Sequence, residues 1–265
     1  SVNGIPVATL ELKNAMTGQT VEHARRQYKQ DRDPREPIFE FKKRTLVHFA
    51  VDTEAVLMTT RLAGNATHFL PFNKGDGGGA GNPPDPQGRS YRTAYLWEEV
   101  LARDSLLDLL ARFLHLQIDE KRDEQGRKVK TEQLVFPRYH QLQAVRSLVA
   151  AAKTEGPGHN YLVEHSAGSG KSNTIAWLTH RLASLHDDSN SRVFDSVIVI
   201  TDRVVLDQQL QDNIYQFEHK QGVVQKIDES SRQLAEALTS AVPIIITTLQ
   251  KFPFVSRQLL KMAEE

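Results

Sequence analysis

The chain contains no cysteine, and this absence removes two kinds of protein from consideration. A cysteine count of zero in 265 residues excludes a disulfide framework and any metal site built from thiolates. Small secreted domains commonly depend on disulfides, whereas proteins of a reducing compartment do not. The composition therefore fits a cytoplasmic protein, and this is the localisation we expect.

The chain also lacks an excess of charge of either sign and any long apolar run. Lys plus Arg and Asp plus Glu each number 33, so the net charge points to no nucleic-acid partner. No stretch approaches the roughly 20 apolar residues of a membrane-spanning helix, and no signal-peptide pattern opens the chain. Hydrophobic residues at 39% and charged residues at 25% are typical of a soluble globular protein. A length of 265 residues allows one large or two ordinary domains.

A strand–turn–helix pattern around Lys171 is the strongest signal in the sequence. The apolar run Tyr161–Val163 predicts a strand, and the apolar spacing of residues 173–182 predicts a buried helix. Between them, residues 165–172 read His-Ser-Ala-Gly-Ser-Gly-Lys-Ser. A Gly-Lys-Ser turn between strand and helix predicts a phosphate-binding loop. The alternative is an ordinary glycine-rich turn, which the Lys-Ser pair and both flanks disfavour.

Each position of this loop has an expected role. Gly168 and Gly170 allow backbone N–H groups to close around phosphate oxygens, where a Cβ atom would intrude. Lys171 can reach the β- and γ-phosphates, and the Ser172 hydroxyl can ligate Mg²⁺. His165 stands at the first position of the motif, where a small residue is usual. The loop therefore predicts a nucleoside triphosphate site.

A second candidate site lies near the start of the chain. Residues 5–13 have the composition of a strand, and a period of two places Glu11 and Lys13 on the same face. A carboxylate and an ammonium so placed could hold Mg²⁺ and steady an attacking water or a phosphoryl oxygen. A plain ion pair on a half-solvated strand also explains these two residues, and the tripeptide alone favours that alternative.

The region after this strand predicts a helix and a hairpin. We expect a helix over residues 17–30 with Thr20 as its N-cap. Residues 25–32 are locally basic and could track a phosphate backbone, although such runs are more often solvated faces. Residues 46–51 and 55–60 predict two strands of a hairpin.

Three further segments complete the first half. Residues 73–89 contain a glycine triplet and predict an exposed loop. Residues 97–116 predict an amphipathic helix or a pair of helices facing a core. We interpret the polar residues 119–134 as a linker between a domain over 1–118 and another over 135–265.

Apolar strands alternate with helices in the second half. Val197–Thr201 and Ile244–Thr248 are apolar runs, and residues 142–153, 207–217 and 231–241 have helical patterns. This alternation favours a doubly wound α/β unit, with a parallel sheet covered on both faces. Ligands of such sheets bind at the carboxyl ends of the strands, where we expect the nucleotide.

Polar residues precede the loop and follow two of these strands. Gln141 offers the donor and the acceptor that an adenine edge requires. Hydroxyl, amide and guanidinium groups at strand ends suit contacts with a nucleic-acid backbone. The polar residues at these strand ends are Asp202, Arg203, Thr247, Thr248 and Gln250.

In this order and spacing the motifs resemble a superfamily 2 helicase or translocase core. Gln141 is similar to the adenine-reading residue of that core, and residues 165–172 are similar to motif I. Residues 200–209 and 246–252 look like later motifs of the first RecA-like domain. Residues 3–14 resemble the Glu-x-Lys strand of a PD-(D/E)xK nuclease. The whole pattern is similar to the restriction (R, motor) subunit of type I restriction–modification enzymes.

The resemblance implies a fold class and a function. The fold is α/β, a PD-(D/E)xK nuclease-like domain followed by a RecA-like P-loop domain. The function is ATP-dependent translocation of duplex DNA coupled to Mg²⁺-dependent cleavage away from the recognition site. The implied partners are double-stranded DNA and the modification (methyltransferase) and specificity subunits of the same complex, with no membrane.

The resemblance also implies roles for individual residues. The implied catalytic residues are Glu11, Lys13 and Gln27, and the implied metal ligands are Glu11 and Ser172. The implied ATP-binding residues are Arg138, Gln141, His165, Ser166, Ala167, Gly168, Ser169, Gly170, Lys171 and Ser172. The implied DNA-binding residues are Asp202, Arg203, Thr247, Thr248 and Gln250.

Some features of the family pattern differ here or fall outside the chain. The family has a Tyr one helical turn from the helix Gln, whereas Tyr28 is adjacent to Gln27. The nuclease Asp would lie on a strand before Ser1, and the Asp-Glu-x-His motif would follow Glu265. We therefore expect an internal fragment of a longer polypeptide. The alternative function is a non-cleaving P-loop ATPase or DNA-remodelling switch with a structural N-terminal domain.

Overall fold

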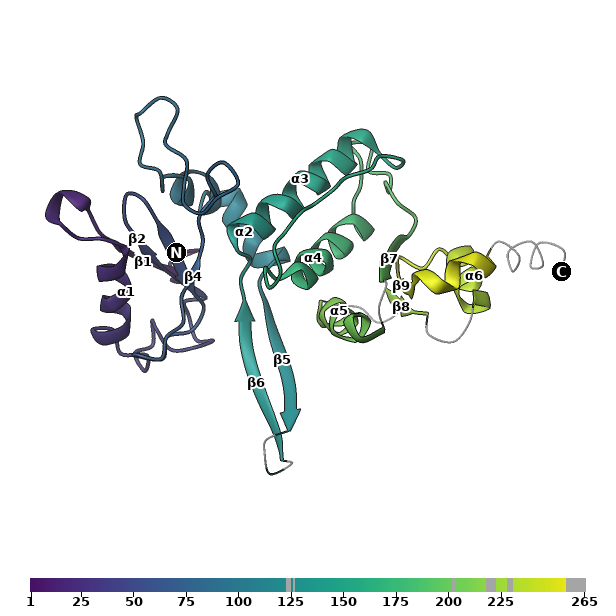
Figure 1. The fold of residues 1–265 in the computed structure, drawn as a ribbon, viewed down its shortest axis with the longest axis horizontal. Coiled ribbons are helices and arrows are strands. Elements are labelled where there is room, and N and C mark those ends of the chain that lie inside the picture. Colours follow the sequence, from purple (N-terminus) through teal and green to yellow (C-terminus); the bar gives the residue numbers. More distant parts are fainter. Residues whose placement is uncertain (123–124, 126, 202–203, 218–222, 228–230, 256–265) are drawn as a thin grey trace. The chain divides into compact units, whose positions relative to one another are not determined.

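The chain forms two compact units, Ser1–His140 and Gln141–Glu265, and each is described by itself. The structure is a computed structural model that describes residues 1–122, 125, 127–201, 204–217, 223–227 and 231–255. Both units mix helices and strands, which confirms the predicted α/β class (Figure 1). Within the described residues, no helix is both long and apolar enough to span a bilayer.

The first unit is built on a four-stranded mixed sheet with the order β1-β2-β3-β4. β1 (Ala8–Leu12) runs parallel to β2 (Val47–Val51), and β3 (Val56–Thr59) and β4 (Leu70–Pro71) complete the sheet in antiparallel pairings. Every residue of β2 is buried, as expected for an apolar strand inside a sheet. The predicted first strand and the predicted hairpin are confirmed.

Helix α1 (Val21–Gln30) covers one face of this sheet, after a short 3₁₀ helix η1 (Ala15–Thr17). Thr20 is its N-cap, as predicted, and the Asp52 carboxylate accepts the first helical amide at 2.6 Å. The apolar face of α1 presents Ala24 and Tyr28, which are 0% and 1% exposed. These side chains pack with Ala50 and Leu62.

A buried polar network ties α1 to β1 and β2. The Thr9 hydroxyl oxygen lies 2.8 Å from the Tyr28 hydroxyl and 2.7 Å from Nδ1 of His48. The Tyr28 and His48 rings meet edge to face at 5.7 Å. Burial raises the pKa of Tyr28 and lowers the pKa of His48 from 6.5 to about 4, because both charged forms lose water. The network therefore holds neutral side chains at neutral pH.

The predicted amphipathic helix pair is present as a π-helix, η2 (Leu96–Val100), and an α-helix, α2 (Arg103–Arg112). Leu109 and Phe113 are both 0% exposed, so they form the buried stripe that the helical spacing predicted. The second helix ends before residue 116 because the chain turns into a strand at His115.

Residues 73–89 contain no helix or strand, as predicted, and the tip of this loop is exposed. Asn82 is the exception, since it is 2% exposed. Its side-chain oxygen accepts the Lys74 amide at 2.8 Å and its side-chain nitrogen donates to the Glu54 carbonyl at 2.9 Å. Asn82 thereby attaches the base of the loop to the β2–β3 hairpin.

The strands β5 (His115–Arg122) and β6 (Lys128–Val135) form a separate antiparallel pair. The two strands pair along their whole length and lie side by side in Figure 1. The stretch 119–134, interpreted as a linker, includes parts of both strands. Apolar residues recur at every second position only at Leu116 and Ile118 of β5, and the charged residues 119–122 that follow hide the strand.

The second unit contains a three-stranded parallel sheet with the order β7-β9-β8. β7 (Val197–Thr201) and β9 (Ile244–Thr248) match the two predicted strands, whereas β8 (Val224–Lys226) was not predicted. β8 has three residues and contains Gln225 and Lys226, so it lacks the apolar run that marks a buried strand.

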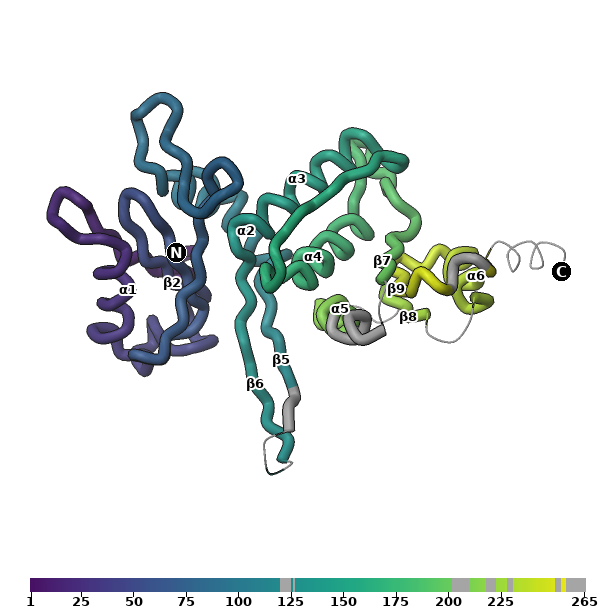
Figure 2. The backbone as a smooth tube through the Cα atoms, in the orientation of Figure 1, coloured from purple at the N-terminus to yellow at the C-terminus, as the bar shows by residue number. Residues whose placement is uncertain are grey.

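Helices alternate with the strands of this sheet along the chain, as the backbone trace in Figure 2 shows. Their bounds are α3 (Tyr139–Glu155), α4 (Lys171–Ala183), α5 (Val204–Gln216), α6 (Ser231–Thr239) and the 3₁₀ helix η3 (Leu249–Phe254). α6 packs Leu234 against Ile245 of β9. α4 packs Trp177 against Phe217, with ring centroids 6.0 Å apart. The predicted helices are confirmed.

Two sequence-based expectations for the second unit are wrong. Tyr161–Val163 form no strand, because the sheet of the described residues does not extend to this segment, and Leu162 is 94% exposed. The sheet is also not covered on both faces along β7, where Ile198 and Ile200 are 36% and 47% exposed. β9, in the middle of the sheet, is the strand that meets the expectation.

The burial of His48 predicts a pH dependence of stability in the first unit. Its pKa is about 4 when folded and 6.5 when unfolded, so the unfolded chain binds more protons between these values. The stabilisation is present above pH 6.5 and is lost as the pH falls towards about 4, by up to about 3 kcal/mol. The His48→Gln variant should lose this slope.

The measurement is urea unfolding between pH 4 and pH 8, followed by the fluorescence of Trp97 in a Trp177→Phe background. His68, an exposed histidine of the same unit, provides the control variant His68→Gln, which should keep the slope. An equal slope in His48→Gln and in the unmodified chain would contradict the assignment.

Candidate functional site

The predicted phosphate-binding loop forms a tight turn that leads directly into α4. Gly168 and Gly170 have φ angles of 72° and 82°, a left-handed backbone that glycine adopts without strain. Gly170 is the N-cap residue, and its carbonyl accepts the amides of Asn173 and Thr174 at 3.1 and 3.3 Å. The first amides of a helix have no partner within it, so this end of α4 is suited to an anion.

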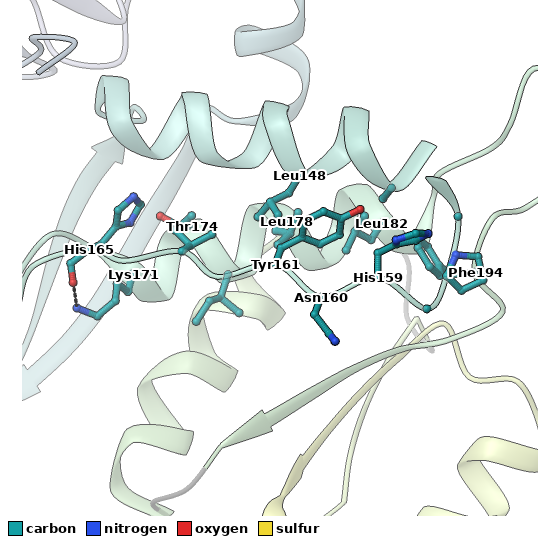
Figure 3. A pocket seen from close by; sticks show the side chains of 16 residues that line it. Leu148, His159, Asn160, Tyr161, His165, Lys171, Thr174, Leu178, Leu182 and Phe194 are labelled. Carbon is teal, nitrogen blue, oxygen red and sulfur yellow. Dashed lines mark hydrogen bonds between the residues drawn. The ribbon is translucent and has the colours of Figure 1, made fainter. Parts of the chain in front are cut away.

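The Lys171 ammonium group lies inside this loop. Its Nζ donates to the carbonyls of His165 and Ser166 at 2.9 and 2.8 Å, and Figure 3 shows the first of these bonds. An anion that entered the loop would offer the ammonium stronger, charged acceptors than these two carbonyls. The loop residues therefore fit a phosphate group.

Gln141 supports the loop from α3. The Gln141 side chain is 4% exposed, and its Nε2 donates to the Gly170 carbonyl at 2.9 Å. A Cβ atom at position 170 would lie 2.6 Å from this same Nε2 atom, so the close approach requires glycine. The contact places Gln141 beside the loop, where its amide group meets the backbone, and its predicted role in reading adenine stays a prediction.

The remaining predicted nucleotide-binding residues differ in position and in exposure. Ser172 lies in the first turn of α4 and is half-buried, and Ser169 is 7% exposed in the turn itself. Ala167 is exposed in the loop, and Arg138 is half-buried just before α3. The loop, Lys171 and Gln141 are thus the part of the predicted site that the structure brings together.

A pocket of about 640 Å³ adjoins Lys171 within the second unit. α3, α4 and residues 156–165 form its walls, and Figure 3 shows Leu148, Leu178 and Leu182 along its length. The lining is mainly apolar, and the segment that failed to form a strand contributes Tyr161 to it. The sequence reasoning missed this pocket because it placed that segment inside a sheet.

The second candidate site forms where β1 meets α1. Glu11 and Lys13 share one face of β1, as predicted, with Oε1 and Nζ 3.4 Å apart. Lys13 Nζ also donates to Oε1 of Gln27 at 2.5 Å. All three predicted catalytic residues are therefore in one cluster. The buried network of Thr9 and Tyr28 lies next to it and fixes the helix that carries Gln27.

Arg32 also belongs to this cluster, and the sequence reasoning missed it. Its Nη2 lies 2.9 Å from Oε2 of Glu11. The bond to Glu11 raises the pKa of Arg32. Arg32 is the last residue of the basic run 25–32. Its partner Glu11 lies 21 positions earlier in the chain, so no local sequence pattern could have predicted the contact.

The described residues of this cluster do not by themselves fit Mg²⁺. Magnesium favours six oxygen ligands, including one or two carboxylates. Here Glu11 supplies one carboxylate, and Lys13 and Arg32 already pair with both of its oxygens. No group of three or more His, Asp or Glu side chains suited to a metal occurs in the part of the chain that the structure describes.

The predicted DNA-binding residues have mixed positions. Asp202 and Arg203 lie outside the described residues. Thr247 is 1% exposed within β9, so other atoms of the protein cover its hydroxyl. Thr248 is half-buried at the carboxyl end of β9, and Gln250 is exposed in η3. Among the described members of this set, Thr248 and Gln250 are the ones that a ligand can reach directly.

Comparison with known families matches both units. Residues 1–67 match the family described as the type I restriction enzyme R protein N terminus. Residues 140–265 match the SWI2/SNF2 ATPase family. The first match includes the cluster around Glu11, and the second includes the phosphate-binding loop. No solved structure matches the chain.

Similar sequences are found among restriction enzymes of Staphylococcus aureus. The chain is 33% identical over 118 residues to the endonuclease subunits of type I restriction enzymes from strains COL, MSSA476 and MRSA252. The matching region covers 44% of this chain and 12% of each relative. The matching region thus spans about an eighth of the length of these relatives.

The two units define an α/β protein in which a nuclease-like domain precedes a RecA-like ATPase domain. The two family matches, in this order, agree with the restriction-enzyme relatives. Together these matches support the conclusion that the chain is a segment of the R subunit of a type I restriction enzyme.

The contact between Gln141 and Gly170 predicts the effect of removing it. Gln141→Ala should weaken nucleotide binding about tenfold, because the Gly170 carbonyl loses a buried hydrogen bond and the turn loosens. Gln143, an exposed glutamine on the same helix, gives the matched control Gln143→Ala. Titration with a fluorescent ATP analogue checks both variants. Equal affinities would show that this hydrogen bond does not organise the loop.

Proposed function

We propose that the chain is part of a motor and endonuclease subunit that translocates duplex DNA with ATP and cleaves it away from the recognition site. The observation that carries the proposal is the pairing of two sites in one chain. One is a phosphate loop with Lys171 inside it, and the other is the cluster of Glu11, Lys13 and Gln27. The restriction-enzyme relatives support the same combination.

ATP binding would use the loop at the start of α4. Backbone amides around Gly168 and Gly170 would surround the phosphates, and Lys171 would exchange the carbonyls of His165 and Ser166 for phosphate oxygens. The Ser172 hydroxyl would ligate Mg²⁺ at the phosphates. Gln141 would contact the adenine base in exchange for its hydrogen bond to the Gly170 carbonyl.

DNA cleavage would use the first unit. Lys13 would stabilise the negative charge that develops on a phosphoryl oxygen during attack by water. Gln27 orients the Lys13 ammonium group through its 2.5 Å hydrogen bond. Mg²⁺ is the proposed cofactor, but the carboxylate of Glu11 needs at least one further acidic ligand from outside the described residues.

DNA translocation would use residues that follow the strands of the second unit. Thr248 and Gln250 are accessible at the end of β9, and such side chains commonly contact the DNA backbone. Modification and specificity subunits of the same complex would be the protein partners, and the cytoplasm the place of action. These assignments rest on the likeness to type I restriction enzymes.

One observation favours a second function, a P-loop ATPase or DNA-remodelling switch that does not cleave. Both oxygens of Glu11 are paired with cations, as in an ion pair whose role is structural. In that case the first unit would be a structural N-terminal domain beside the ATPase domain. The cleavage assay described next separates the two functions.

Glu11→Gln and Lys13→Ala in the full-length protein should abolish DNA cleavage and leave ATP hydrolysis within about twofold. Attack on the phosphodiester and hydrolysis of ATP use different sites, so they should separate. Plasmid linearisation and phosphate release measure the two activities. Glu22→Gln alters a carboxylate that pairs with Arg25 on the surface of α1, and it should leave both intact. Loss of both activities from Glu11→Gln would favour a structural strand.

Lys171→Ala in the full-length protein should lower ATP turnover about 100-fold or more, because it removes the positive charge placed at the terminal phosphates. Binding of duplex DNA should change by less than about twofold, since other residues contact the DNA. The control is Lys153→Ala, a surface lysine of the same unit that pairs with Asp188. Turnover equal to that of the unmodified protein would rule out the assigned role.

A further inference from the structure

In the cluster around Glu11, each side-chain acceptor oxygen is already paired with a cation. Oε1 of Glu11 lies 3.4 Å from Nζ of Lys13, and Oε2 lies 2.9 Å from Nη2 of Arg32. Oε1 of Gln27 accepts a hydrogen bond from the same Lys13 ammonium group at 2.5 Å. A ligand that approaches these side chains therefore meets donors more readily than acceptors.

The further donors belong to Arg32 and Gln27. A guanidinium group has five N–H donors, and the bond to Glu11 occupies one of them. The side-chain amide of Gln27 has two N–H donors beside the oxygen that holds Lys13. Phosphate oxygens suit a guanidinium group as well as carboxylate oxygens do. The donors left in the cluster therefore favour an anion such as a phosphate group.

Arg32 is the most exposed of the three charged residues. Its side chain is 35% exposed, against 15% for Glu11 and 13% for Lys13. The hydrogen bond to Glu11, and to a smaller extent the charge of the exposed Asp31, raise the pKa of Arg32 and keep it charged. Asp31 weakens the attraction for an anion, but it occupies none of the printed contacts of Glu11 or Lys13. Glu11 thus fixes the guanidinium group of a charged arginine that solvent can reach.

Arg35 provides a comparison close to the cluster. It pairs with Asp33 at 2.8 Å and its side chain is 89% exposed, so it lies outside the group around Glu11. Arg32 and Arg35 carry the same charge and lie three positions apart in the chain. An effect of charge alone would be shared by both arginines, whereas an effect of the cluster belongs to Arg32.

We propose that Arg32 and Gln27 bind a backbone phosphate of duplex DNA at the exposed side of the Glu11 cluster. Glu11 orients the guanidinium group through Oε2, and Lys13 offsets the charge of the carboxylate. The contact needs no metal ion, because it consists of hydrogen bonds from N–H groups to phosphate oxygens. This inference rests on the DNA substrate of the proposed function. In the alternative, Arg32 pairs with Glu11 only to hold the turn after α1.

The test measures how tightly the full-length protein binds a short duplex without a recognition site, by fluorescence anisotropy. EDTA is present and nucleotide is absent, so neither a metal ion nor ATP contributes. Each dissociation constant is measured at several salt concentrations, because its dependence on salt reports the number of phosphate contacts. The variants are Arg32→Ala, Arg32→Lys, Gln27→Ala, Glu11→Gln and the control Arg35→Ala.

Arg32→Ala should weaken DNA binding about tenfold, because a charged hydrogen bond to phosphate is lost. Its affinity should also depend less steeply on salt, by about one phosphate contact. Arg32→Lys keeps the charge and should keep the salt dependence. Gln27→Ala removes an uncharged donor, so affinity should fall about threefold with the same salt dependence. Arg35→Ala should stay within about twofold of the unmodified protein.

Glu11→Gln separates the proposal from the structural alternative. The variant removes a negative charge beside the phosphate, so it should bind DNA at least as tightly as the unmodified protein. If Arg32 serves only the ion pair, Glu11→Gln and Arg32→Ala break the same contact and should weaken DNA binding alike. Opposite effects of the two variants support the phosphate site, and equal weakening overturns it.

Three further results would overturn the proposal. They are an unchanged affinity and salt dependence in Arg32→Ala, an equally large loss in Arg35→Ala, and weaker binding by Glu11→Gln than by the unmodified protein. The last of these decides the question even if Arg32→Ala does not fold. Cleavage that persists in Glu11→Gln and Lys13→Ala would remove the proposed cleavage site, whereas the phosphate site depends on the DNA affinities alone.

Discussion

The Gly170 carbonyl oxygen is the point at which the second unit assembles its candidate nucleotide site. It accepts the amides of Asn173 and Thr174, which start α4, and the side-chain amide of Gln141 from α3. These donors and the Thr174 hydroxyl, which lies 3.5 Å away, converge here because a glycine with a left-handed backbone allows close approach. The direction of α4, the position of Lys171 and the packing of α3 against the loop all depend on this arrangement.

The first unit is subject to a different constraint: polar side chains that are buried against its small sheet need hydrogen-bond partners. It buries the uncharged side chains of Tyr28 and His48, which the partly buried Thr9 hydroxyl contacts within hydrogen-bond distance. The charged residues Glu11 and Lys13 lie further out on the same face of β1. The neutral network of Thr9, Tyr28 and His48 therefore lies next to the charged pair of Glu11 and Lys13. The network holds α1 against the sheet, and α1 carries Gln27, which contacts Lys13.

Local patterns predicted most of the elements, but they failed where a strand needs distant partners. β9 was predicted correctly because its apolar run reflects burial on both faces. β8 was missed since it has three residues and two polar side chains. Tyr161–Val163 has the composition of a strand yet forms none, because pairing depends on an adjacent strand edge as well as on composition. The antiparallel pair of β5 and β6 was obscured by its many charged residues.

The sequence by itself determined the motifs, the alternation that puts Glu11 and Lys13 on one face, and the turn that leads into α4. These features follow from the short periods of strands and helices and from the backbone freedom of glycine. Tertiary structure decided which groups meet: Arg32 with Glu11, and Gln141 with the Gly170 carbonyl. Those pairs lie 21 and 29 positions apart, so their contact depends on how helices pack on the sheet and loop. No short-range pattern encodes that packing, and the charge balance around Glu11 is a consequence of it.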